Sequence, residues 1–301
     1  MTSLDFLRQG PPAGGNFEQS WSHNYLSAHV ISDIGKRRER NEDSALLGGP
    51  HDIELLDGCG YLFAVADGMG GASAGERASQ LALSSFSEAF YESPAENVPA
   101  RMRASVEAAN ASVFHESETI AEYQGMGTTL SAVAIIGDCA YIGQVGDSRV
   151  YLSRSDGKLL QLTHDHSLVA EQVRGGLISE EEARTHAMKN LITRAVGIRD
   201  EVEVDLFGVQ LDKNDTLMIC SDGLCNFVTD EEIGGCLQLK SLTSTARVLV
   251  GKALEAGGTD NISVVVVRLI DAPPRKPLHE GCATIETPPV SFWSKVGRIF
   301  G

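Results

Sequence analysis

The stretch Tyr61-Leu-Phe-Ala-Val-Ala-Asp-Gly-Met-Gly-Gly71 decides the fold of this chain. Its apolar run from Leu62 to Ala66 predicts a strand that is buried on both faces and leads straight into Asp67. The glycines that follow open a turn with no side chains in the way. A carboxylate at the end of a buried strand is costly to desolvate, so we expect Asp67 to meet a positive partner.

The same arrangement occurs again at Leu217-Met-Ile-Cys-Ser-Asp222-Gly223. A lone Asp-Gly pair is typical of a tight turn and would indicate nothing more. Two such pairs, each at the end of an apolar strand, favour carboxylates that converge on cations.

The composition argues against some classes of function. The chain has 301 residues and a net charge of −16, which disfavours nucleic-acid binding through a basic face and suits a site that collects cations. Its six cysteines show neither a Cys-x-x-Cys nor a Cys/His zinc spacing, so we interpret most of them as reduced core residues. No segment approaches the roughly 18 apolar residues that span a bilayer, and the N-terminus lacks a basic-then-apolar signal. We therefore expect a cytoplasmic protein.

The order of the other segments predicts an α+β fold. Helical spacing of apolar residues predicts helices over 73–91, 95–122, about 230–238 and 242–256. Short apolar runs predict strands over 26–33, 128–136, 139–145, 149–153, 158–162, 202–209, 216–220 and 262–270. The strands between 128 and 162 are joined by two-residue turns, which predicts an antiparallel meander. Because strands and helices do not alternate, we favour an antiparallel two-sheet β-sandwich with helices outside.

The predicted core is one domain over residues 25–271, with a polar, helix-rich insertion over 165–198 and an N-cap at Ser179. Residues 1–24 predict a flexible leader, and residues 272–290 predict a Pro-rich linker. Residues 291–301 predict an amphipathic helix with Phe, Trp, Val and Ile on one face. This tail either docks on a partner, a membrane surface or its own domain, or has no role of its own.

Acidic residues at strand ends and glycine turns form the candidate site: Asp43, Asp67, Asp147, Asp222 and Asp260. Carboxylates without His or Cys at ligand spacing suit Mg²⁺ or Mn²⁺ rather than Zn²⁺. Such a cluster could not stay ionised without about two divalent ions. Two ions about 3.5–4 Å apart are a common arrangement for phosphoester hydrolysis, because they acidify a bridging water and stabilise the entering and leaving oxygens.

Six short motifs occur in the order and rough spacing of the metal-dependent protein phosphatases. They are Arg38-x-x-Asn41-Glu42-Asp43, Asp67-Gly-Met-Gly-Gly71, Gly127-Thr-Thr129, Gly146-Asp-Ser-Arg149, Ser221-Asp222-Gly223 and Gly258-Thr-Asp260-Asn261. Over about residues 26–270 the chain thus resembles the PP2C-like (PPM) serine/threonine phosphatases, in particular their bacterial branch. The resemblance implies an α-β-β-α sandwich, and the tract over 162–197 resembles the variable flap that the family places beside its site.

The resemblance implies two Mg²⁺ or Mn²⁺ ions per domain and a third, weaker one. Asp67 matches the carboxylate that bridges both ions, with the Gly68 carbonyl as a further ligand. Asp222 and Asp260 match the ligands of the first ion.

Three more acids complete the implied ligand set. Glu42 and Asp43 match ligands on the side of the second ion, largely through water. Asp147 matches the position associated with the third ion, which it shares with Asp222.

The implied reaction is direct attack by the hydroxide that bridges the two metals on the phosphorus of phosphoserine or phosphothreonine, with no phosphoenzyme. Arg38 matches the arginine that clamps the phosphate, a task that suits a planar guanidinium, with Arg37 and Arg40 as alternatives in register. Met69 stands where many eukaryotic members carry a histidine proposed as leaving-group acid, and methionine cannot donate a proton. A water or another group must therefore serve.

Two other pairs of residues could act in metal binding or catalysis, or could be ordinary surface or packing residues. His164 and His166 could hold a metal or act as acids, but two histidines on a polar loop are more often hydrogen-bonded surface residues. Cys220 and Cys225 flank Asp222, but a thiol nucleophile needs a nearby base and a phosphate-binding loop, so we interpret both as packing residues.

The leading hypothesis is a protein serine/threonine phosphatase that opposes a bacterial serine/threonine kinase. The alternative from another class is a catalytically silent member of the fold that binds phosphoproteins or another partner. A metal-dependent hydrolase of nucleotides or nucleic acid is a third hypothesis, which the negative charge and the lack of a basic groove weaken.

Overall fold

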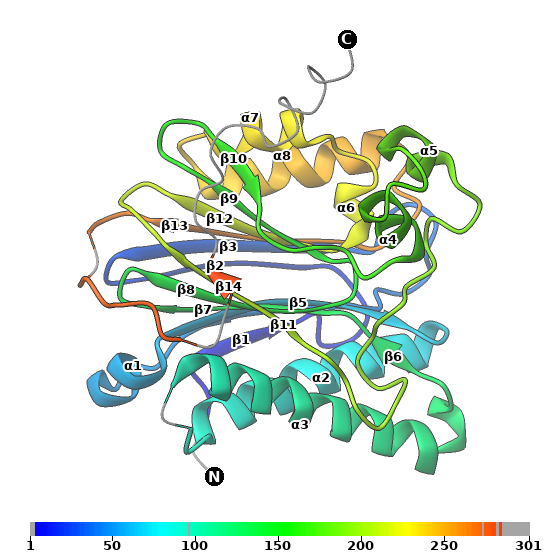
Figure 1. The fold of residues 1–301 in the computed structure, drawn as a ribbon, viewed down its shortest axis with the longest axis horizontal. Coiled ribbons are helices and arrows are strands. Elements are labelled where there is room, and N and C mark those ends of the chain that lie inside the picture. Colours follow the sequence, from blue (N-terminus) through cyan, green and yellow to red (C-terminus); the bar gives the residue numbers. More distant parts are fainter. Residues whose placement is uncertain (1–3, 96, 273, 281–282, 285–301) are drawn as a thin grey trace.

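Two sheets, lying face to face, form the centre of the molecule, and helices cover the outer face of each (Figure 1). The computed structural model describes residues 4–95, 97–272, 274–280 and 283–284. The predicted class, an α+β fold with a helix-flanked two-sheet sandwich, is confirmed.

The first sheet has the strand order β1-β4-β5-β7-β8-β11-β14 in the described residues, with β6 paired to β5. Its strands are β1 (Leu7–Gly10), β4 (Asp43–Gly48), β5 (Tyr61–Met69), β6 (Gly127–Thr128), β7 (Leu130–Ile136), β8 (Cys139–Val145), β11 (Asp205–Gln210) and β14 (Ala283–Thr284). The second sheet has the order β10-β9-β12-β13-β3-β2. Its strands are β2 (Phe17–His23), β3 (Leu26–Asp33), β9 (Arg149–Ser153), β10 (Leu159–Gln161), β12 (Thr216–Cys220) and β13 (Ile262–Leu269).

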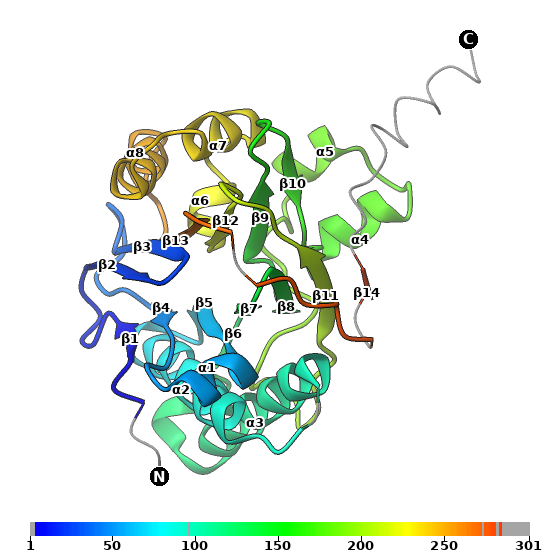
Figure 2. The ribbon, with the colours of Figure 1, turned by 90° about the vertical axis from the view of Figure 1, so that its left-hand side faces the viewer.

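The helices separate into two outer layers and a flap, which Figure 2 shows from the side. The first sheet is flanked by α1 (Ile53–Cys59), α2 (Ala72–Glu92), α3 (Val98–Thr119) and the short 3₁₀ turn η1 (Ala121–Tyr123). The second sheet is flanked by α6 (Asp222–Cys225), α7 (Asp230–Leu237) and α8 (Leu242–Glu255). The flap contains α4 (Leu168–Arg174) and α5 (Glu180–Thr185), and Ser179 caps α5 as predicted.

The decisive strand, β5, is buried on both faces because its side chains alternate between two cores. One core lies between the sheets and includes Tyr61, Phe63 and Val65. The other lies between the first sheet and helices α2 and α3 and includes Leu62, Ala64 and Ala66. This double burial explains why the apolar run is unbroken, and it holds Asp67 on a rigid strand.

The predicted meander over residues 128–162 is wrong. β7 and β8 form a hairpin in the first sheet, whereas β9 and β10 pair in the second. The chain crosses between the sheets at Gly146-Asp147, where Gly146 has a φ of 104°. A short glycine turn does not reveal whether the next strand returns beside the last one or enters the facing sheet, where β9 pairs with β12.

The predicted flexible leader is also wrong for the described residues. β1 pairs with β4 at one edge of the first sheet, and β2 pairs with β3 in the second. Phe17 and Trp21 of β2 pack against the core between the sheets, while polar residues alternate with them. This alternation is typical of an edge strand with one solvent-facing side.

Part of the expected linker is bound to the domain. The backbone N–H of Lys276 donates to Asp138 Oδ1 at 2.7 Å, and β14 pairs in parallel with β11. The predicted tail helix over 291–301 lies outside the described residues. Within the part of the chain that the structure describes, none of the helices combines the length and apolar character of a membrane span.

Candidate metal and phosphate site

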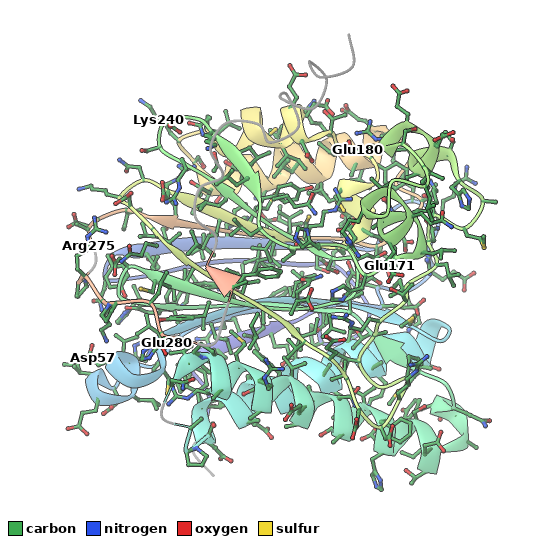
Figure 3. The ribbon with its side chains drawn as sticks, in the orientation of Figure 1. Asp57, Glu171, Glu180, Lys240, Arg275 and Glu280 are labelled. Carbon is green, nitrogen blue, oxygen red and sulfur yellow. The ribbon has the colours of Figure 1, made fainter. Side chains whose placement is uncertain are left out.

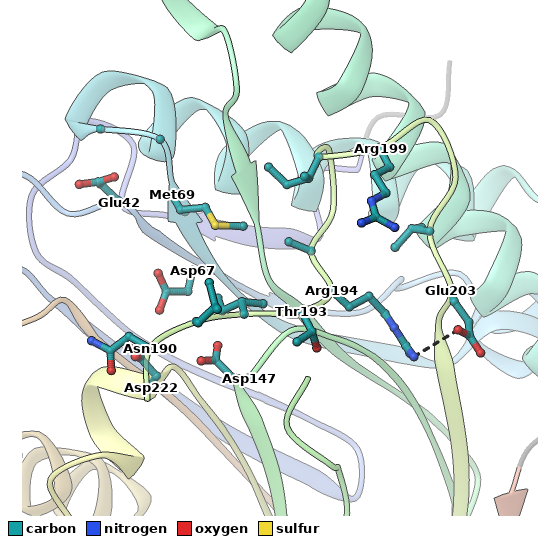
Figure 4. Close-up of a pocket in the computed structure, with 18 of the residues that line it drawn as sticks. Glu42, Asp67, Met69, Asp147, Asn190, Thr193, Arg194, Arg199, Glu203 and Asp222 are labelled. Atoms are coloured by element: carbon teal, nitrogen blue, oxygen red, sulfur yellow. Dashed lines mark hydrogen bonds and ion pairs between the residues drawn. The ribbon is translucent and has the colours of Figure 1, made fainter. Parts of the chain in front are cut away.

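The candidate site is a groove of about 1230 Å³ at one end of the sandwich. Figure 4 shows Asp67, Asp147 and Asp222 gathered in one part of the groove, with Arg199 and Glu203 farther away along it. The predicted site residues that line it are Arg38, Glu42, Asp67, Gly68, Asp147, Asp222 and Asp260. Asp43 is the remaining member of the predicted set, and it is buried in the adjacent strand.

Strand register places the first two aspartates. Asp43 of β4 and Asp67 of β5 are directly opposite each other in the antiparallel pair. The N–H of Asp67 donates to Thr129 Oγ1 at 2.9 Å, and Ser221 Oγ donates to Asp43 Oδ2 at 2.8 Å. The second bond ties β4 to the end of β12, so it connects the two sheets beside the groove. The other carboxylate oxygen of Asp43, Oδ1, is buried and has no hydrogen-bond partner among the described residues.

Chain turns place the remaining aspartates. Asp147 lies at the crossover between the sheets, and Asp260 comes just before β13. Asp222 begins α6, and Asn226 Nδ2 donates to its Oδ2 at 3.0 Å. The Oδ1 atom of Asp222 is buried and lacks a hydrogen-bond partner in the described part of the chain. Carboxylates from distant parts of the sequence therefore line one groove.

Burial and mutual repulsion raise the pKa values of these carboxyl groups. Burial, followed by the charge of neighbouring aspartates, raises the pKa of Asp147 to about 8 and that of Asp222 to about 6. Burial, opposed by hydrogen bonds from two serines, raises the pKa of Asp43 to about 7. For Asp67, burial and four surrounding aspartates hold the pKa well above 3.8. The protein alone therefore does not stabilise this set of charges, and cations are the missing partners.

The residues fit hard divalent cations. Two buried carboxylate oxygens without partners, on Asp43 and Asp222, are a costly arrangement unless a positive charge satisfies them. No group of three or more His, Cys, Asp or Glu side chains among the described residues is close enough to hold an ion unaided. A bound ion would complete its shell with water and backbone oxygens, as Mg²⁺ commonly does.

Of the three arginines in the loop before β4, only Arg38 lines the groove. Its Nη2 lies 2.8 Å from Asp260 Oδ1 and its Nη1 lies 3.3 Å from Glu42 Oε1, while 43% of its side chain is exposed. Arg40 instead pairs with Glu76 at 2.6 Å. The guanidinium of Arg38 is therefore the one beside the carboxylates, with further N–H groups able to bind an anion.

Asn261 holds this loop in place, a role that its motif did not predict. Its Oδ1 accepts from the N–H of Glu42 at 2.8 Å, and its Nδ2 donates to the carbonyls of Ile34 and Arg40 at 2.9 and 3.0 Å. The side chain is buried, so these bonds fix where Arg38 and Glu42 enter the groove. The only signal in the sequence is a polar pair directly before a buried strand.

The facing side of the groove comes from the flap and the loop after it. Residues 190–195, which we name the flap wall, line it, followed by residues 198–203. Buried Asn110 of α3 anchors the second segment, because its Oδ1 accepts from the N–H of Gly197 at 2.8 Å and its Nδ2 donates to the carbonyl of Arg199 at 2.9 Å. The sequence predicted a flap beside the site but none of these residues, since an irregular loop carries no periodic signal.

The structure tests the plain interpretations of the histidine pair, His164 and His166, and of the cysteine pair, Cys220 and Cys225. His164 is exposed, as expected, and its ring lies 5.9 Å from that of Phe207. His166 is only 4% exposed, so the expectation of a surface residue is wrong for it. Cys220 packs in the core under α7 and α8. A hydrogen bond with Cys220, together with burial, raises the pKa of the Cys225 thiol, which disfavours a thiolate nucleophile.

A family sequence model described as Protein phosphatase 2C matches residues 37–253. The serine/threonine phosphatase stp of Listeria welshimeri is 39% identical over 247 residues, which cover 80% of this chain and 95% of that protein.

Two solved structures of related proteins share the fold. The serine/threonine phosphatase PstP/Ppp of Mycobacterium tuberculosis has a TM-score of 0.73 and 38% identity, over 82% of this chain and 99% of that chain. The catalytic domain of the phosphatase PstP, in complex with two manganese ions, has a TM-score of 0.71 and 37% identity, with coverage of 82% and 99%.

Proposed function

Since this chain belongs to the protein phosphatase 2C family, we propose that it is a metal-dependent protein serine/threonine phosphatase. Its substrates are proteins that carry phosphoserine or phosphothreonine. The related stp and PstP proteins are named serine/threonine phosphatases and cover most of this chain, which supports the assignment.

The observation that carries this proposal is the gathering of aspartates from β4, β5 and the start of α6 around one groove. Buried oxygens of Asp43 and Asp222 have no partner in the described residues, and the pKa of Asp67 is raised by burial and by the surrounding aspartates. A site that needs cations, opens to solvent and carries an arginine suits a phosphate ester.

We assign Mg²⁺ or Mn²⁺ to this site, as two ions and a third, weaker one. When bound, the ions would neutralise the carboxylates and acidify the attacking water. Asp67 would be shared by the two ions, with the Gly68 carbonyl as a further ligand, and Asp222 and Asp260 would hold the first ion. The other assigned positions are Glu42 and Asp43 for the second ion, largely through water, and Asp147 for the third.

Two side chains define how a phosphate fits. Arg38 is fixed at its Nη atoms by Asp260 and Glu42 and steadies the phosphate oxygens that do not react. Met69 lines the groove beside Gly68 and has no proton to give, so the leaving oxygen receives its proton from a water or from another group. Attack is direct, and no covalent phosphoenzyme forms.

The test is release of phosphate from a phosphothreonine peptide in Mn²⁺. We expect wild-type activity that EDTA abolishes and Asp222→Asn reduces by at least a hundredfold, because one ligand of the ions is lost. Asp57→Asn is the matched control, since Asp57 is exposed on α1 and Figure 3 shows it far from the flap residue Glu171. Binding of the phosphopeptide without release of phosphate would support the silent binding module instead.

The wider assignments follow from the same function. Residues 25–271, together with strands β1 and β2, form the catalytic domain. The cognate partner is a serine/threonine kinase whose products it dephosphorylates, and the site of action is the cytoplasm. Residues 291–301 dock on a partner or a membrane surface. Deletion of residues 288–301 would then change localisation or partner recovery, while phosphate release from a short peptide stays at the wild-type rate. Unchanged localisation together with unchanged partner recovery would remove the docking assignment.

A further inference from the structure

The imidazole of His166 connects two sides of the groove. On one side it holds Gly146, the residue immediately before Asp147. The N–H of Gly146 donates to His166 Nδ1 at 3.1 Å, and the backbone N–H of His166 donates to the Gly146 carbonyl at 2.9 Å. Gly146 adopts a left-handed φ, and an added Cβ would collide with Thr129. The carbonyl of Gly146 also accepts from Gln144 Nε2 at 3.0 Å, so the ring of His166 is the group that holds the N–H of Gly146 and with it the direction in which Asp147 leaves the crossover.

On its other side His166 holds the flap wall. Its carbonyl accepts from the N–H of Thr193 at 2.8 Å, and its Nε2 lies 3.1 Å from Asp205 Oδ2. Arg194 of the flap wall donates from Nη1 to Asp205 Oδ1 at 2.7 Å. Asp205 begins β11, so the flap wall is anchored to the first sheet through one carboxylate.

These contacts define the tautomer of the ring. Nδ1 accepts a hydrogen bond from the N–H of Gly146 and therefore carries no proton, so Nε2 is protonated and donates a hydrogen bond to Asp205. The Nη1 atom of Arg194 also lies 3.2 Å from Nε2, but both are donors, and we attribute their closeness to the carboxylate that they share. Burial lowers the pKa of His166, which is consistent with a neutral ring.

We propose that His166 is a positioning residue that fixes Asp147 and the flap wall in one arrangement, so that a peptide substrate and the weaker third cation are bound together. The proposal rests on the proposed function. A small phosphate ester needs the cations and Arg38, whereas a phosphopeptide also contacts the wall formed by residues 190–195. Loss of the ring should therefore affect peptides more than small esters.

The test compares His166→Ala with wild type on a phosphothreonine peptide and on p-nitrophenyl phosphate. We expect the KM for the peptide to rise about tenfold and the KM for the small ester to change less than twofold, since the ring loses its hydrogen bond to Asp205, the carboxylate that anchors Arg194 of the flap wall. Calorimetric titration with Mn²⁺, which does not depend on turnover, should show weaker binding of the weakest ion. His164→Ala, two residues away and exposed, should behave as wild type in all three measurements.

Conservative variants separate the two sides of the ring. The amide of Asn in His166→Asn can accept from Gly146 as Nδ1 does, so we expect Mn²⁺ binding to recover while the peptide KM stays high. Asp205→Asn keeps the ring and the Gly146 contact but weakens the anchor of Arg194, so it should raise the peptide KM alone; it also serves if His166→Ala does not fold. The proposal would be overturned if His166→Ala and Asp205→Asn kept the wild-type ratio of peptide KM to ester KM and His166→Ala also bound Mn²⁺ as wild type does. A wild-type protein without metal-dependent activity would instead overturn the proposed function.

Discussion

Binding of Mn²⁺ at pH 7 should release on the order of two protons from this protein. The perturbation is addition of metal to EDTA-treated, desalted protein. A carboxyl with a pKa of about 7, as for Asp43, is half protonated at pH 7, and one with a pKa of about 8, as for Asp147, is roughly nine-tenths protonated. Asp222, with a pKa of about 6, carries roughly a tenth of a proton at pH 7, and Asp67, whose pKa is held well above 3.8, carries at most one. Ligands must be ionised, so these protons leave when the metal binds.

The assay is isothermal titration calorimetry at one pH in several buffers that do not chelate Mn²⁺ and differ in ionisation enthalpy. The slope of the observed enthalpy against the buffer enthalpy gives the number of protons released. That number should increase at pH 6, where Asp222 is half protonated, and should decrease at pH 8.5. Asp57→Asn should match wild type. Proton release close to zero at both pH 6 and pH 7 would refute the reasoning, because the aspartates would then be ionised without metal.

The same pKa values set the sign of a stability change. Because the folded-state pKa values of Asp43, Asp147 and Asp222 lie above 3.8, the metal-free folded protein binds more protons than the unfolded chain between about pH 4 and pH 8. Their contribution to the free energy of unfolding is therefore lost as pH rises through this window. We expect the difference in Tm between Mn²⁺-loaded and EDTA-treated protein to widen from pH 5.5 to pH 8. A difference that narrows would contradict this sign.

Three substitutions test individual contacts. Arg38→Lys should raise the KM for a phosphopeptide about tenfold with a smaller change in Mn²⁺ affinity, because a point charge replaces a planar fork; an unchanged KM would remove the clamp assignment. Ser221→Ala removes a hydrogen bond to buried Asp43 and should lower the free energy of unfolding by about 1–2 kcal/mol in EDTA, measured by urea denaturation. Asn261→Ala leaves the N–H of Glu42 and two carbonyls unpaired, and it should lower the free energy of unfolding by about 2–4 kcal/mol in the same measurement. The control is Asn24→Ala, near the opposite end of β3, which should lower it by less.

The sequence predicted the parts of the site that lie on buried strands. Asp67 and Asp222 follow apolar runs whose burial on both faces can be recognised from composition alone, and both runs are strands in the structure. β1 and β2 were missed because edge strands with one solvent-facing side contain too few apolar residues to stand out from a polar leader. Turn residues specify local backbone conformation and not which sheet receives the next strand, so the sequence predicts a meander turn at Gly146 where the structure has a crossover.

The flap wall could not be predicted residue by residue for a different reason. The position of the flap wall depends on a contact between distant segments, that of His166 with Asp205, and the position of the loop after it depends on Asn110, which binds residues 197–200. These contacts use ordinary polar residues at spacings that no helix or strand period requires. Such tertiary hydrogen bonds decide where irregular segments lie, and local sequence patterns carry no signal for them.

The carboxylates are placed by the fold and not by their attraction to one another. Asp43 and Asp67 face each other because β4 and β5 are in register, and Asp222 is held at the start of α6 between two packed layers. Without metal these groups repel, so the cores on either side of each sheet must supply the stability that the site lacks. Removal of one charge in Asp222→Asn should therefore leave the fold intact and raise the Tm of the metal-free protein, while Mn²⁺ affinity falls. Scanning calorimetry of that variant with and without EDTA separates the two effects, and a lower Tm in EDTA would show that Asp222 supports the fold itself.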